Sequence, residues 1–167
     1  TLIQCAQPYT NLNDAYRATT NNVDHPTQRH CDSATGTDVG GGRWYRFSGE
    51  GGDALPLSPP GVRRCGTDAT GWLSGWDGGV GTGCSSGYLA TTGPPCDYRT
   101  PGCYPVATDG VAEMNVCFDD SSGDACYMRV VVGVVRCEGF LLWRLPYVPN
   151  CGAGYCTVPS GLLTGEG

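Results

Sequence analysis

Eleven cysteines spread over 167 residues restrict the fold of this chain more than any other feature. They are spaced along the sequence rather than grouped in CxxC pairs, and a cytosolic protein does not carry so many free thiols. We therefore expect an oxidising compartment and a fold held together by disulfides. Because eleven is odd, at least one cysteine is left after intrachain pairing, as a buried free thiol or as a bond to a second chain.

The composition indicates one secreted, β-rich domain covering residues 1–167. The 27 glycines and 12 prolines leave few helix interiors, because these two residues have the poorest helix propensities. The formal net charge is -6 and every basic residue is arginine, so no nucleic-acid partner is predicted. No apolar run is long enough for membrane insertion, and TLIQCAQPYT is typical of a mature N-terminus after signal removal.

The stretch RWYRF, residues 43–47, is bounded by glycines and predicts a short strand. Alternation along this strand divides its side chains between two faces, with Trp44 and Arg46 on one and Arg43, Tyr45 and Phe47 on the other. We interpret the aromatic residues here as core residues rather than as the floor of a binding site.

The most regular part of the chain is its C-terminal third. Three β-branched or aromatic runs bounded by turn residues predict successive antiparallel strands in residues 111–118, 125–137 and 139–148. The first forty residues are expected to form loops with one helical turn near Asp14. Residues 78–110 are predicted to be an inserted loop bounded by disulfides. The fold class is therefore mostly β, a small antiparallel sheet that is loop-rich and stapled by disulfides.

The segments WYRFSGEGG, RRCGTDATGWLSG and VRCEGFLLWRLPYVPNCGAGYCT together resemble the uromodulin-type eight-cysteine extracellular domain. The resemblance runs from Cys5 to Cys156. It implies a disulfide framework made by eight positions: Cys5, Cys31, Cys65, Cys117, Cys126, Cys137, Cys151 and Cys156. Three extra cysteines, Cys84, Cys96 and Cys103, depart from the pattern; we expect two of them to pair and the third to bridge chains.

The resemblance implies a secreted β module without known catalytic machinery. In two members of the family the module presents glycans to bacterial adhesins, but this chain has no N-x-S/T sequon, so that role does not carry over. The sequence also does not continue into a polymerising module, and we expect a free-standing protein. The odd cysteine predicts a homo-oligomer linked by a disulfide.

Enzymatic and metal-binding residues are not evident in the sequence. The two histidines, His25 and His30, lie in a polar loop without a GxSxG or HExxH motif, which argues against hydrolysis. The acidic stretch DDSSGD, residues 119–124, invites a calcium hypothesis, but it lacks the spaced D-x-D-x-D-G pattern and the distal Glu. We interpret it as a solvated hairpin turn, and we expect no cofactor and no metal.

Aromatic residues in glycine-rich turns are the best candidates for ligand contact. Flat rings stack on the C–H faces of sugars, while carboxylates and amides bind the hydroxyls. The predicted ligand-binding residues are Trp76, Asp77, Tyr88, Asp97 and Tyr98, with Arg99 as an accessory donor. Trp72 and Leu73 form a short apolar segment between turns, and the alternative is that Trp72 and Trp76 fill a small core.

The leading functional hypothesis is a non-enzymatic secreted protein that recognises glycans or extracellular glycoproteins, binding carbohydrate as a multimer. One rival is a structural or protein-binding component of the extracellular matrix that uses the same surfaces for assembly. Another is a protease inhibitor that presents Arg99 in the loop between Cys96 and Cys103.

Overall fold

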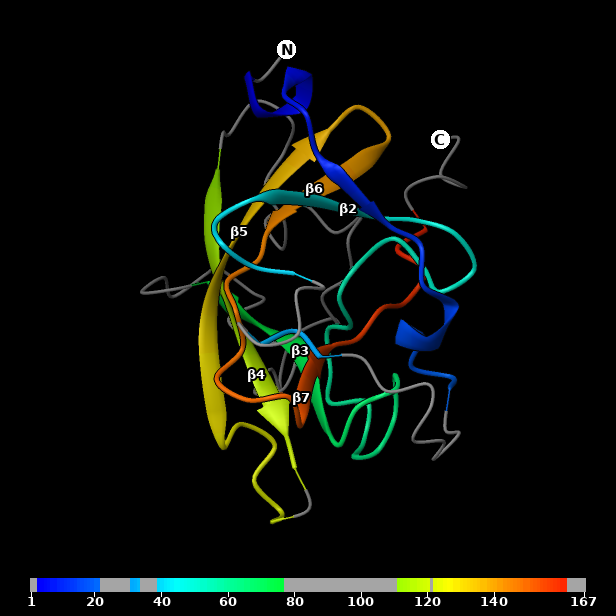
Figure 1. Cartoon of the computed structure of the whole chain (residues 1–167), viewed down its shortest axis with the longest axis vertical. Helices are drawn as coiled ribbons and strands as arrows, with labels where there is room; N and C mark the ends of the chain where they lie inside the picture. The colour runs from blue at the N-terminus through cyan, green and yellow to red at the C-terminus, as the bar shows by residue number, and fades with distance from the viewer. Residues whose placement is uncertain (1–2, 22–30, 34–38, 77–110, 121, 162–167) are drawn as a thin grey trace, which may run out of the picture.

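A computed structural model describes residues 3–21, 31–33, 39–76, 111–120 and 122–161. Within these residues seven strands form one sheet in the order β1-β2-β6-β5-β4-β3-β7 (Figure 1). The strands are β1 Thr10–Leu12, β2 Trp44–Phe47, β3 Ala69–Trp76, β4 Ala112–Asp119, β5 Met128–Cys137, β6 Phe140–Arg144 and β7 Ala153–Tyr155. Two short 3₁₀ helices, η1 Ile3–Ala6 and η2 Ala15–Arg17, precede β2.

The predicted C-terminal strands are confirmed as the centre of the sheet. β4, β5 and β6 pair in antiparallel order, with Val116 opposite Val130 and Val134 opposite Trp143. β2 extends this meander by pairing antiparallel with β6. In Figure 1 the β4–β5 turn points down and the β5–β6 turn points up, so the two hairpins mark opposite ends of the sheet. Asp119 ends β4, and Asp120 and residues 122–124 lie in the β4–β5 turn, which confirms the hairpin turn predicted for this segment.

Several elements differ from the sequence prediction. The first forty residues contain the strand β1, which pairs parallel to β2, as well as η2, the helical turn that the sequence predicts near Asp14. Residues 69–76 form a full strand, β3, where the sequence predicts turns around Trp72 and Leu73. β7 pairs parallel to β3 at the other edge. These segments are rich in glycine, asparagine and threonine, and only pairing with a neighbouring strand selects the extended form.

The main core lies on one face of the sheet. Val116, Phe118, Val132 and Val134 point into it from β4 and β5, because alternate residues of a strand share a face. Trp72 is also buried, at 1% exposure, and its indole N–H donates to the Ala125 carbonyl over 2.8 Å. The interpretation of Trp72 as a core residue is therefore confirmed.

The alternation predicted for RWYRF is confirmed for residues 44–47, but Arg43 precedes β2 and is exposed, so its predicted place on the face of Tyr45 and Phe47 is wrong. Tyr45 and Phe47 are buried in the main core, while Trp44 and Arg46 are half-buried on the opposite face of β2. There the guanidinium of Arg144 lies 5.6 Å from the centre of the Trp44 ring. These aromatic residues are structural.

A buried ion pair joins the N-terminal segment to the last strand. Arg17 in η2 donates from Nη1 and Nη2 to the two carboxylate oxygens of Asp32, each over 2.9 Å. The Tyr155 amide donates to Asp32 Oδ2 over 2.9 Å, and Arg17 Nη1 donates to the Tyr155 carbonyl over 3.3 Å. Burial by itself lowers the pKa of Arg17, but the charge and hydrogen bonds of Asp32 outweigh it and raise the pKa above its ordinary value.

Four disulfides staple the sheet and its loops, and they use all eight framework cysteines. The pairs are Cys5–Cys137, Cys31–Cys151, Cys65–Cys156 and Cys117–Cys126. Each bridge typically stabilises a fold by about 2 to 4 kcal/mol. Cys84, Cys96 and Cys103 lie outside the described residues, so the pairing predicted for them stays a prediction.

Candidate functional site

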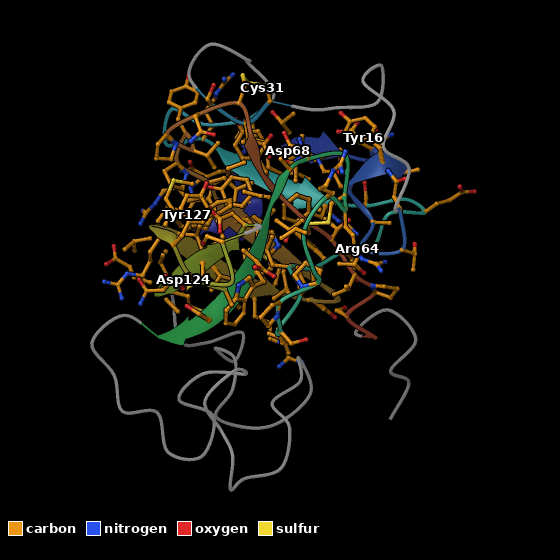
Figure 2. The ribbon with its side chains drawn as sticks, turned by 90° about the horizontal axis from the view of Figure 1, so that it is seen from below. Tyr16, Cys31, Arg64, Asp68, Asp124 and Tyr127 are labelled. Carbon is orange, nitrogen blue, oxygen red and sulfur yellow. A yellow bond between two sulfur atoms is a disulfide. The ribbon has the colours of Figure 1, made fainter. Side chains whose placement is uncertain are left out.

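A polar cleft opens at the end of the sheet that carries the β4–β5 turn. Its volume is about 300 Å³, at the lower end of the range for small-molecule sites. Three segments that are far apart in the sequence line it: Val62, Arg63, Asp68 and Ala69; Asp120 and Tyr127; Asn150 and Gly152. Figure 2 looks at this end from below and shows Tyr127 and Asp124 on one side, with Asp68 nearer the middle.

The side chains around the cleft offer an aromatic surface beside hydrogen-bonding groups. The Tyr127 side chain is 39% exposed. Asp120 Oδ1 accepts hydrogen bonds from the amide and hydroxyl of Ser122, and Asn150 Oδ1 accepts one from the Gly152 amide over 2.9 Å. Among the described residues, Asp120 Oδ2, the Asn150 side-chain amide and the Tyr127 hydroxyl have no partner. An acceptor, a donor and a ring are thus open to a ligand.

Disulfides fix all three lining segments. Cys65 follows Arg63 by two residues, Cys126 directly precedes Tyr127, and Cys151 directly follows Asn150; each belongs to a different bridge. Short hydrogen bonds add to this, since the Ala69 amide donates to the Gly152 carbonyl over 2.7 Å. The cleft is therefore preorganised, which lowers the entropy lost on binding.

The backbone of the first lining segment is unusual. Arg63 and Cys65 have φ angles of 58° and 59°, in the left-handed region that non-glycine residues rarely adopt. Cys65 is held there by its bond to Cys156, and the Arg63 amide donates to the Asp68 carbonyl over 3.0 Å. Strained residues of this kind cluster at functional sites.

The edge of the cleft is acidic. Asp119 ends β4 next to Asp120, and Asp124 follows in the same turn. Partial burial raises the pKa of the Asp119 carboxyl above its usual value, and the charges of Asp120 and Asp124 raise it further. Nevertheless, no group of three or more metal-ligating side chains suited to an ion occurs in the described part of the chain.

A second hollow, of about 240 Å³, lies beside the end of β2. Two of its charged side chains are already engaged. The Asp53 carboxylate accepts the amide and hydroxyl of Ser160 over 2.6 and 2.5 Å. The guanidinium of Arg46 stacks on the Phe140 ring at 4.2 Å. This hollow therefore offers fewer groups to a ligand than the polar cleft.

The ligand-binding residues predicted from the sequence are not brought together within the described residues. Trp76 ends β3 with its backbone opposite Met114, and its side chain falls outside the description. Asp77, Tyr88, Asp97, Tyr98 and Arg99 lie outside the described residues, as do His25 and His30. These assignments stay predictions.

The residues that line the polar cleft are not evident from the sequence pattern. That pattern predicts a strand around Tyr127 and a solvated turn at Asp120, and it indicates no role for Arg63, Asp68 or Asn150. One sequence signal is shared by three of them: Arg63, Tyr127 and Asn150 each stand within two residues of a framework cysteine. A disulfide restrains the backbone of the residues next to it whatever the loop composition.

Comparison with known proteins agrees with the disulfide-stapled fold. Residues 80–157 match the family of domains described as uromodulin-like, a range that includes Cys84, Cys96 and Cys103. The family pattern thus extends over most of residues 78–110, the segment predicted to be an insertion. None of the helices in the described ranges is long and apolar enough to cross a membrane.

Two mammalian proteins are similar over nearly the whole chain. The pancreatic secretory granule membrane major glycoprotein GP2 of Homo sapiens is 30% identical over 161 residues, which cover 96% of this chain and 23% of GP2. Uromodulin of Rattus norvegicus is 27% identical over 162 residues, covering 95% of this chain and 19% of uromodulin. The chain thus spans less than a quarter of the length of these relatives. The resemblance to the uromodulin-type eight-cysteine domain is therefore confirmed.

Proposed function

We propose that this chain is a non-enzymatic, secreted recognition protein that binds carbohydrate through the polar cleft. One observation carries the proposal. An exposed tyrosine ring lies beside the open acceptor of Asp120 and the open donor of Asn150, in a cleft lined by three disulfide-anchored segments. Sugars need this combination, because their C–H faces stack on rings while their hydroxyls both donate and accept hydrogen bonds.

The secreted location is supported by the four disulfides, which form and persist in oxidising compartments. It is also supported by similarity to GP2, whose name describes a glycoprotein of the secretory granule membrane.

We further propose that the protein acts as a disulfide-linked homo-oligomer. Because the eight framework cysteines pair with one another, the odd cysteine falls among Cys84, Cys96 and Cys103. These three residues can form at most one pair, which leaves a thiol for a second chain. A dimer would present two clefts, and two linked sites bind a multivalent glycan surface far more tightly than one.

Binding of the purified, non-reduced protein to a broad glycan array, with and without a chelator, tests the function. We expect selective binding to particular glycans, and we expect Tyr127→Ala to abolish that binding. A chelator should leave the binding unchanged, because we expect no metal at the site. Tyr147→Ala is the matched control, because both tyrosine side chains are 39% exposed and Tyr147 does not line the cleft. Absence of binding to every glycan would refute the carbohydrate proposal and favour a matrix or protein-binding role.

A further inference from the structure

The polar cleft carries an excess of negative charge. Two carboxylates, Asp68 and Asp120, and one guanidinium, Arg63, line it. Asp119 and Asp124 flank Asp120 in the β4–β5 turn, and the exposed Arg129 lies two residues along the chain from Tyr127. Among the residues that the structure describes here, and with Arg129 counted, four carboxylates stand against two guanidiniums. The remaining nearby arginine, Arg64, donates to the Thr19 carbonyl over 3.3 Å.

The carboxylates repel one another at this site. The pKa of Asp119 is raised by burial and then by the charges of Asp120 and Asp124. An anionic group entering the cleft would meet the same repulsion, whereas hydroxyl groups would be favoured because carboxylates are strong hydrogen-bond acceptors.

On the basis of the proposed function, we propose that the polar cleft selects glycans that end in a neutral sugar and rejects the same glycans when they end in an anionic group. The Tyr127 ring stacks on the C–H face of the terminal sugar. The sugar hydroxyls donate to the carboxylate of Asp120 and accept from the side-chain amide of Asn150. A terminal sialic acid, sulfate or phosphate places its negative charge next to the carboxylate of Asp120, which repels it.

The rigidity of the lining segments makes this selection effective. A flexible acidic loop could move its carboxylates away from an anion, but Asp120 lies between Cys117 and Cys126, which are bonded to each other. Ser122 also holds Asp120 through its amide over 2.8 Å and through its hydroxyl. The charge therefore stays at the mouth of the cleft, and the discrimination does not relax on binding.

The test uses immobilised glycan pairs that differ only in a terminal anionic group. The pairs are lactosamine with and without sialic acid, galactose with and without sulfate, and mannose with and without phosphate. In each pair that the intact, non-reduced protein binds, the neutral member is expected to bind at least about tenfold more tightly. Raising the salt from about 0.1 M to 1 M should narrow this ratio, because the Debye length falls from about 10 Å to 3 Å.

Two variants separate charge selection from binding itself. Asp120→Asn keeps the shape of the side chain and is expected to reduce the neutral-to-anionic ratio about fivefold. Tyr127→Ala should lose binding to both members of each pair, while Tyr147→Ala should change neither. Intact disulfides by mass and an unchanged melting temperature confirm that each variant is folded.

Failure of the selectivity can be told apart from failure of the function. Equal or tighter binding of the anionic members would overturn the charge selection and leave carbohydrate binding standing. Absence of binding to all six probes would overturn both proposals. A ratio that Asp120→Asn and salt leave unchanged would show that the discrimination is steric, which also overturns the electrostatic inference.

Discussion

Replacing Asp32 by Asn is expected to destabilise the fold by about 3 to 5 kcal/mol, the range for breaking a buried ion pair by removing one partner. The Arg17 and Asp32 side chains are only 1% and 0% exposed. Asp32 accepts two hydrogen bonds from Arg17 and one from the Tyr155 amide, each over 2.9 Å. An asparagine at position 32 has one acceptor oxygen, and its amide group would face N–H donors while the arginine charge stays buried and uncompensated.

Denaturant titration of the non-reduced proteins measures the difference in free energy of unfolding between Asp32→Asn and the unchanged chain. The midpoint should fall with little change in slope, because the surface exposed on unfolding is unchanged. A thermal scan should show a loss of about 6 to 20 °C, since each kcal/mol shifts the melting temperature of a domain of this size by about 2 to 4 °C. Asp14→Asn, which removes the partly exposed contact to Arg17 Nε, is the control and should cost about 1 kcal/mol or less.

A double variant distinguishes the cost of an unpaired buried charge from the cost of lost side-chain packing. Arg17→Met with Asp32→Leu removes both charges, so it should be less destabilised than Asp32→Asn alone. A loss below about 1 kcal/mol for Asp32→Asn, or a double variant that is less stable than Asp32→Asn, would refute the reasoning.

Two further predictions concern a glycine and a surface carboxyl. Gly52→Ala should destabilise the fold by about 3 kcal/mol or more, because the φ angle of Gly52 is 110° and a Cβ would lie 2.3 Å from the Val158 carbonyl carbon. Gly139→Ala is the control: the φ angle of Gly139 is 80° and nothing lies within 4 Å of the added Cβ, so the loss should be only about 1 to 2 kcal/mol. Equal losses of unfolding free energy in denaturant titrations would contradict this. Because the pKa of Asp119 is raised, its destabilising effect is absent below the usual carboxyl pKa, grows between the usual and the raised pKa, and is complete above the raised one. Asp119→Asn should therefore raise the melting temperature slightly at pH 7, by the equivalent of about 0.5 kcal/mol or less, and not at pH 3; a gain of the same size at both pH values would argue against the charge effect.

The regular strands could be predicted because their residues carry the pattern of a half-buried sheet. Val130, Val132 and Val134 alternate along β5, and Tyr45 and Phe47 alternate along β2, so burial of one face selects the extended form. The three-residue strands β1 and β7 have too few residues to show such a pattern. They are strands because parallel partners, and the hydrogen bonds around Arg17 and Asp32, hold them in place.

The disulfide connectivity could not be predicted, because eight cysteines allow about 105 pairings and spacing does not choose among them. The polar cleft could not be predicted for a related reason. Tyr127, Asn150 and Asp68 come from three separate segments, and their turn-like sequences say nothing about which turns meet.

The sequence by itself determined the β-rich, disulfide-stapled class through its cysteine, glycine and proline content and its local periodicity, and its motifs carried the resemblance to the uromodulin-type domain. Tertiary structure alone decided which cysteines bond, which edge strands form and which loop residues converge on one cleft. Those features depend on contacts between residues far apart along the chain, where the free energy is set by packing and pairing partners rather than by any local pattern.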